Sequence, residues 1–93
     1  MYMAGAWRFE EMEPCKLPQR VEIAFKEATE GLVGMSYTPV LYVASQIVNG
    51  MNYCIICKTV METNPPKEGC KKVVIYQPLD EGKARFIEVS DII

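Results

Sequence analysis

The pair Asn49-Gly50, set between two apolar runs, is the feature that most constrains the fold of this chain. Asn-Gly favours a type I′ turn, because both central residues adopt positive φ there, and that turn joins two antiparallel strands. The flanking runs "VLYVASQIV" and "MNYCIICKTVME" are rich in β-branched and aromatic residues, which favour strands. The sequence therefore predicts a β-hairpin with an apolar tip, although hairpin tips usually face water and are polar.

An amphipathic helix is predicted from Leu17 to about Leu32. Apolar residues recur there at spacings of three and four, and charged residues occupy the opposite side. Pro18 is expected in the first turn of this helix, and Gly31 and Gly34 are expected to mark its end. The apolar side consists of Leu17, Val21, Ala24, Phe25, Ala28 and Leu32. We expect this side to pack on the core.

The remaining segments predict strands in hairpin order. Residues 6–11 favour a short edge strand, residues 71–77 and 84–89 favour two further strands, and residues 63–69 and 78–83 favour turns. Strands that follow one another at hairpin spacing pair antiparallel. We therefore expect an α+β fold, in which one long helix packs across a four- to five-stranded antiparallel sheet, as a single domain over residues 1–93. Trp7 is expected to pack under the helix or the sheet edge.

Composition disfavours several classes of function. The chain has no histidine, which removes the commonest general base and metal-binding nitrogen, so we expect no enzyme and no cofactor. A net charge of −2, with scattered Lys and Arg, disfavours nucleic-acid binding. The chain lacks an apolar run long enough to span a membrane, and its start lacks signal-peptide character. We expect a cytoplasmic protein if the chain is complete, and an extracytoplasmic one if a leader was removed.

The four cysteines are compatible with two disulfides, a metal site or free thiols. They are Cys15, Cys54, Cys57 and Cys70. Cys54 and Cys57 have the spacing of zinc and redox motifs, but they lie inside a predicted strand, where residues three apart point to opposite faces. We therefore expect strand cysteines with one in the core, and no metal site. A metal or redox protein is the least favoured of three functional hypotheses.

Gln46-Ile47-Val48-Asn49-Gly50 fits the QxVxG motif, and the chain resembles the cystatins, which are reversible protein inhibitors of papain-like cysteine proteases. The motif continues into "MNY", as it does in that family, and the order of a helix followed by a strand meander is also similar. Pro78-Leu79 stands at the family's second inhibitory loop, and Gly5 resembles the glycine of its N-terminal trunk. The resemblance covers essentially the whole chain.

This resemblance implies a non-covalent inhibitor whose N-terminal trunk and two hairpin loops form one wedge in the protease cleft. The implied protease-binding residues are Ala4, Gly5, Ala6, Gln46, Ile47, Val48, Asn49, Gly50, Pro78 and Leu79, with Trp7 as a further candidate. Leu79 stands where many members carry tryptophan, so we expect weaker or narrower inhibition. We expect a monomer, with a domain-swapped dimer as the alternative. The second hypothesis is a cystatin-fold module that binds another protein and inhibits no protease.

Overall fold

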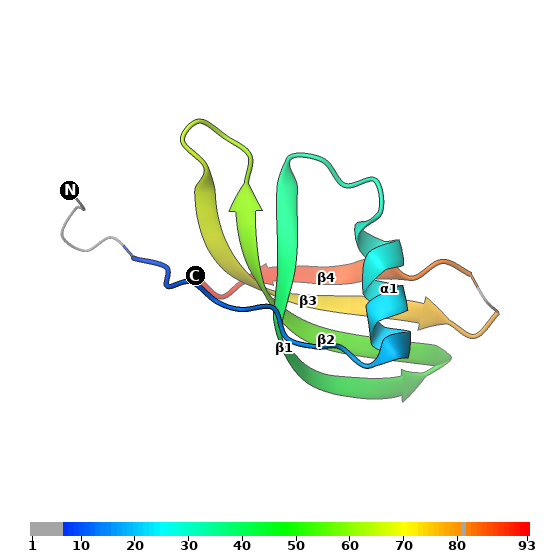
Figure 1. Ribbon diagram of the computed structural model, residues 1–93. Helices are drawn as coiled ribbons and strands as arrows, with labels where there is room; N and C mark the ends of the chain where they lie inside the picture. Colours follow the sequence, from blue (N-terminus) through cyan, green and yellow to red (C-terminus); the bar gives the residue numbers. More distant parts are fainter. Residues whose placement is uncertain (1–6, 81) are drawn as a thin grey trace.

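The computed structural model describes residues 7–80 and 82–93, which form one helix packed on a four-stranded antiparallel sheet (Figure 1). The elements are α1 (Gln19–Thr29), β1 (Met35–Val48), β2 (Gly50–Met61), β3 (Lys67–Pro78) and β4 (Arg85–Asp91). The α+β class and the antiparallel meander are thus confirmed. The strand predicted at residues 6–11 is not formed over its described part, since residues 7–18 contain no helix or strand. The described sheet therefore has four strands and not five.

The strands lie side by side in chain order, β1-β2-β3-β4, and the sheet is strongly curved (Figure 1). Two strands begin earlier than predicted: β1 starts at Met35, ahead of Pro39, and β3 starts at Lys67 inside the predicted loop. Pro39 is tolerated because β1 is an edge strand, where a missing N–H breaks no interior ladder, and the register shifts directly after it. The pairing of each strand with its neighbour, rather than the strand propensity of the local sequence, therefore sets where β1 and β3 begin.

The helix is shorter than the predicted segment at both ends. Pro18 occupies the N-cap position with an extended ψ of 149°, so Leu17 precedes the helix, yet its side chain is buried. At the other end Gly31 adopts φ +79°, a conformation that glycine accepts readily and that stops the helix. Leu32 consequently leaves the apolar side and is 47% exposed, so its predicted place in the core is wrong. No helix in the described chain is long and apolar enough to cross a membrane.

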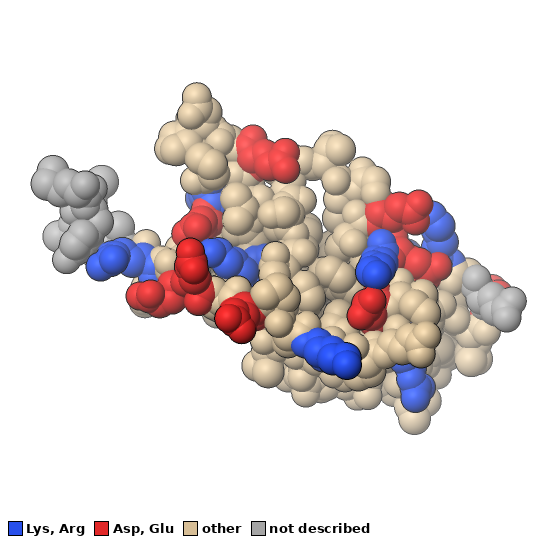
Figure 2. All heavy atoms as spheres, in the orientation of Figure 1, with Lys and Arg blue, Asp and Glu red and all other residues tan. Residues whose placement is uncertain are grey.

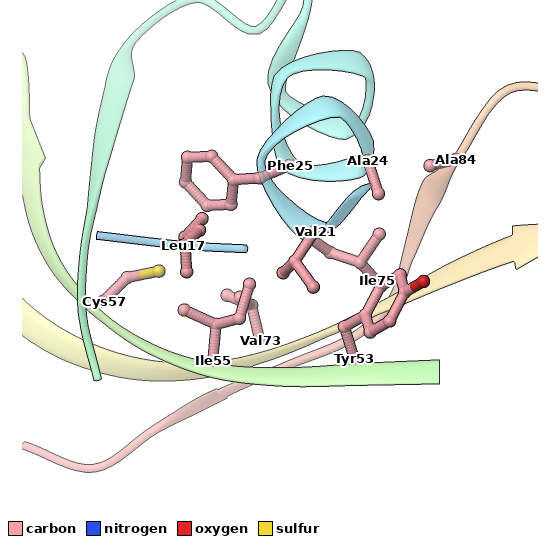
Figure 3. Close-up of a cluster of buried hydrophobic side chains, with 10 residues drawn as sticks. All are labelled: Leu17, Val21, Ala24, Phe25, Tyr53, Ile55, Cys57, Val73, Ile75 and Ala84. Atoms are coloured by element: carbon pink, nitrogen blue, oxygen red, sulfur yellow. The ribbon is translucent and has the colours of Figure 1, made fainter. Parts of the chain in front are cut away.

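The core lies between α1 and the face of the sheet that the helix covers (Figure 3). Its buried residues are Leu17, Val21, Ala24, Phe25, Tyr53, Ile55, Cys57, Val73, Ile75 and Ala84. From Tyr53 onward, burial alternates along β2: Tyr53, Ile55 and Cys57 are buried, whereas Cys54 and Ile56 are partly exposed. This period of two is that of a strand with one covered face, and it confirms Cys57 as a core residue.

Trp7 does not pack under the helix or the sheet edge, so that prediction is wrong. It is 73% exposed and lines a shallow groove with Phe9, Val60 and Pro66, near the turn between β2 and β3. The extended segment 7–18 is attached to β1 by a backbone hydrogen bond from Cys15 N–H to the Pro39 carbonyl, with an N···O distance of 2.9 Å. The core is formed without Trp7.

Candidate functional site

Two turns lie next to each other at one end of the sheet, and together they carry an exposed apolar surface. Gly50 in β2 lies opposite Val48 of β1 and also opposite Pro78 of β3, which brings the β1–β2 turn beside the β3–β4 turn. We call the residues of these turns the tip surface, which comprises Ile47, Val48, Asn49, Pro78 and Leu79. Figure 1 shows both turns at the right of the view, at the end of the sheet opposite the β2–β3 turn.

The apolar side chains of the tip surface face solvent. Ile47 is 84% exposed, Leu79 is 73% exposed and Val48 is 40% exposed. Burying one such side chain stabilises the folded state by about 1.5–3 kcal/mol. Core residues contribute this free energy to folding, whereas the exposed side chains of the tip surface do not. Contiguous exposed apolar patches mark binding surfaces, which makes the tip surface a candidate site.

The first turn is tighter than the predicted two-residue type I′ loop. Val48 pairs with Gly50 and Ile47 pairs with Met51, which leaves Asn49 as the single residue between the paired strands. Gly50 has φ +123°, and a Cβ at this position would lie 2.2 Å from the Gln77 carbonyl oxygen of β3. Gly50 is buried, so its part in the site is to let β2 approach β3 closely beneath the turn.

The second turn is held by side chains on both of its sides. Gln77 Nε2 donates to the Gly82 carbonyl at 3.0 Å, and Gly82 N–H donates to Asp80 Oδ1 at 3.2 Å. On the helix side, Ala84 N–H donates to Glu27 Oε1 at 3.3 Å. These contacts fix the base of the turn and leave Leu79 projecting into solvent.

Gln46, the first residue of the motif, is exposed and engaged within the protein. Its Oε1 accepts a hydrogen bond of 3.1 Å from Asn52 Nδ2, directly across the β1–β2 hairpin. The side chain thus braces the hairpin below the tip surface.

Three residues of the N-terminal part of the implied wedge, Ala4, Gly5 and Ala6, lie outside the described residues. Trp7, the nearest described residue, lies near Val60 and Pro66, at the other end of the sheet. The structure therefore brings together the candidate residues of the two turns, and it does not bring Trp7 to them.

The cysteines do not converge on a common site. Within the described residues no group of three or more Cys, Asp or Glu side chains has the geometry of a metal site, and all four cysteines are free thiols. Burial raises the pKa of the Cys57 thiol to about 12, with smaller contributions from Cys15 and Cys70. Cys57 is therefore a protonated core side chain at neutral pH and a poor nucleophile.

The first turn lies in a long uncharged stretch. Residues 31–57 contain no Asp, Glu, Lys or Arg, so every ionised side chain of the chain lies outside β1, the first turn and the first half of β2. In Figure 2 the lower rim of the molecule is mostly uncharged, and β1 lies along this rim in Figure 1. Charged side chains gather over other parts of the same face. The first turn of the tip surface is therefore uncharged.

Sequence reasoning missed Tyr76, whose hydroxyl donates a hydrogen bond to the Asn49 carbonyl at the tip. Twenty-seven residues separate the two partners, and only the register of β2 on β3 brings them together. No local motif marks this contact.

No known protein family matches this chain, and comparisons with curated proteins and with solved structures found no match either.

Proposed function

We propose that this protein is a reversible, non-covalent inhibitor of papain-like cysteine proteases that inserts the tip surface into the active-site cleft. The observation that carries the proposal is the pair of exposed apolar residues Ile47 and Leu79 on adjacent turns, set side by side by the pairing of Gly50 with Pro78. The QIVNG motif and the Pro78-Leu79 turn support the same partner class through their resemblance to the cystatins.

The physical basis of inhibition is burial of a surface that is already ordered. A cleft that holds extended peptides presents apolar and backbone groups, and each apolar side chain of the tip surface gains about 1.5–3 kcal/mol when it leaves water. The hydrogen bonds at the base of both turns limit the conformational entropy lost on docking.

The inhibitor need contribute no catalytic residue. Cleavage requires a peptide bond near 3–3.5 Å from the protease nucleophile in the correct orientation, and a tight turn such as Val48-Asn49-Gly50 does not offer an extended bond in that geometry. The turn therefore blocks the cleft while remaining uncut.

The alternative is a binding module that uses the tip surface against another protein. The position of Trp7 favours this alternative, because it lies at the opposite end of the sheet, whereas the implied wedge begins with an N-terminal trunk beside the two loops.

A titration of papain separates the two functions. Under reducing conditions, increasing amounts of the protein are expected to abolish hydrolysis of a small peptide substrate, with an apparent inhibition constant that rises linearly with substrate concentration. Activity should return on dilution, because no covalent bond forms. If papain remains fully active at micromolar concentrations of the protein, the inhibitor function is contradicted and the binding module is the function that stands.

A further inference from the structure

Four side chains form a row across the sheet, directly below the tip surface. Gln46 of β1 lies opposite Asn52 of β2, Asn52 lies opposite Tyr76 of β3, and Tyr76 lies opposite Arg85 of β4. The neighbouring Tyr53 is buried beneath α1, and successive side chains of a strand point to opposite faces, so the row lies on the face that the helix leaves open.

Tyr76 makes the most contacts in this row. Its hydroxyl donates to the Asn49 carbonyl, and the Arg85 guanidinium carbon lies 5.1 Å from the centre of its ring, within the range of a cation–π contact. The ring also lies along Gly50, since its Cε1 is 3.1 Å from the position that a Gly50 Cβ would take. Tyr76 thus spans from β3 to the one residue of the first turn that has no strand partner.

We infer that Tyr76 is a positioning residue for the tip surface: its hydroxyl holds the Asn49 carbonyl and so fixes the first turn relative to the second. This inference rests on the proposed function. The strand that carries Tyr76 continues through Gln77 into Pro78 and Leu79, so one side chain ties both turns to the same stretch of backbone.

The mechanism is preorganisation rather than contact with the protease. Without the hydroxyl, the Asn49 carbonyl bonds to water, and the turn samples orientations in which Ile47 and Leu79 no longer face the same groove. A protease must then select or restore the correct orientation, which weakens binding without removing any residue from the interface.

The substitution Tyr76→Phe removes the hydroxyl and keeps the ring beside Gly50 and Arg85. A neutral hydrogen bond contributes enough that we expect the dissociation rate from papain to rise about fivefold, with little change in the association rate. In the free protein, amide hydrogen exchange at Asn49 and Gly50 should accelerate by a similar factor, while exchange at Ile55 and Val73 stays unchanged.

Tyr37→Phe is the matched control. Tyr37 of β1 packs edge-on against Phe86 of β4, and its hydroxyl has no hydrogen-bond partner within the described residues. This variant should change neither the exchange at the turn nor the dissociation rate. Arg85→Gln removes the cation from the Tyr76 ring but leaves the hydroxyl, and it should produce a smaller acceleration at the turn than Tyr76→Phe.

The exchange measurement decides the inference independently of the protease. Unchanged amide exchange at Asn49 and Gly50 in Tyr76→Phe would overturn the inference. An acceleration of exchange spread evenly over the core would also overturn it, because either result would show that the hydroxyl does not stabilise the turn locally. If the wild-type protein leaves papain active but the turn still loosens in Tyr76→Phe, the proposed function fails and the positioning role stands.

Discussion

The two ends of the sheet are built from the same strands and differ in the chemistry of their turns. The β2–β3 turn, residues 62–66, is Glu-Thr-Asn-Pro-Pro, and the neighbouring strand ends are joined by an ion pair between Lys58 and Glu68, with an N···O distance of 3.4 Å. The turns at the other end present Ile47, Val48 and Leu79 to water. The β2–β3 turn thus closes its hairpin without an Ile, Val or Leu, although the exposed Trp7 lies near it, so the fold itself does not require these residues at the other turns.

This difference is consistent with our proposal that the tip surface binds a partner. The residues that hold it in place (Gly50, Gln77 and Tyr76) lie below the exposed side chains and form hydrogen bonds or a close backbone approach. Structural support and exposed apolar area are therefore carried by different residues. This separation makes it possible to damage one without the other.

The largest expected effect is on stability, from a change in one of the residues that hold the tip surface in place. Gly50→Ala places a Cβ 2.2 Å from the Gln77 carbonyl at a positive φ, so it should lower the free energy of unfolding by roughly 3 kcal/mol or more. Gly31→Ala is the matched control, because Gly31 also has positive φ but a Cβ there meets nothing within 4 Å; it should cost only about 1 kcal/mol. Chemical denaturation measures both. Equal losses in the two variants would deny the close approach of β2 to β3.

The next effect is on the exposed side chains. The double variant Ile47→Asp/Leu79→Asp should weaken inhibition of papain by about 100-fold or more, because two apolar contacts are lost and two charges enter an apolar cleft. Its melting temperature should stay within a few degrees of wild type, since both side chains are largely exposed.

Val33→Asp is the control for that double variant. Val33 is 93% exposed and lies between α1 and β1, outside the tip surface. The Val33→Asp variant should inhibit papain as strongly as the wild-type protein does. A loss of inhibition in Val33→Asp equal to that of the double variant would place the interface elsewhere.

A smaller effect comes from the covered middle of the sheet, where Cys57 is buried. Its pKa rises from 9.0 to about 12 on folding, so above pH 9 the unfolded chain loses a proton that the folded chain keeps. Stability should therefore fall as pH rises, by about 1 kcal/mol between pH 9 and pH 10 from this group. Denaturation of wild type and Cys57→Ala at both pH values isolates the contribution. A fall of the same size in Cys57→Ala would assign the pH dependence to other groups.

The smallest effect is expected at the ion pair beside the second turn. Lys83 Nζ lies 3.0 Å from Glu30 Oε2, and both side chains are well exposed, so solvent and salt screen the pair. Glu30→Gln should change the free energy of unfolding by less than about 0.5 kcal/mol and leave papain inhibition within twofold. A larger loss of inhibition would show that the base of the second turn depends on this contact.

The amphipathic helix and the strand order were predictable because each depends on a local period. The ends of the helix were harder to predict. Leu17 and Leu32 fit the helical spacing of apolar residues, but the backbone conformations of Pro18 and Gly31 set where the helix begins and ends. The early start of β1 was missed because Pro39 argues against a strand interior, and only its place on an edge strand permits it.

For the site, the apolar character of the first turn was visible in the sequence, whereas its support was not. The row through Asn52, Tyr76 and Arg85 depends on the register of all four strands, which no short stretch of sequence encodes. The exposure of Trp7 was also missed, because an aromatic residue near a predicted helix suggests packing, whereas Trp7 is 73% exposed near the β2–β3 turn.

The most direct test maps the binding footprint on the labelled protein. Amide chemical shifts of the isotope-labelled chain are recorded with papain whose active-site thiol carries a small blocking group, so that no cleavage occurs. The account predicts changes at residues 47–50 and at Leu79, and none at residues 62–66 of the opposite turn. Changes confined to residues 62–66, or no changes at micromolar concentrations, would contradict the claim that the tip surface occupies the cleft.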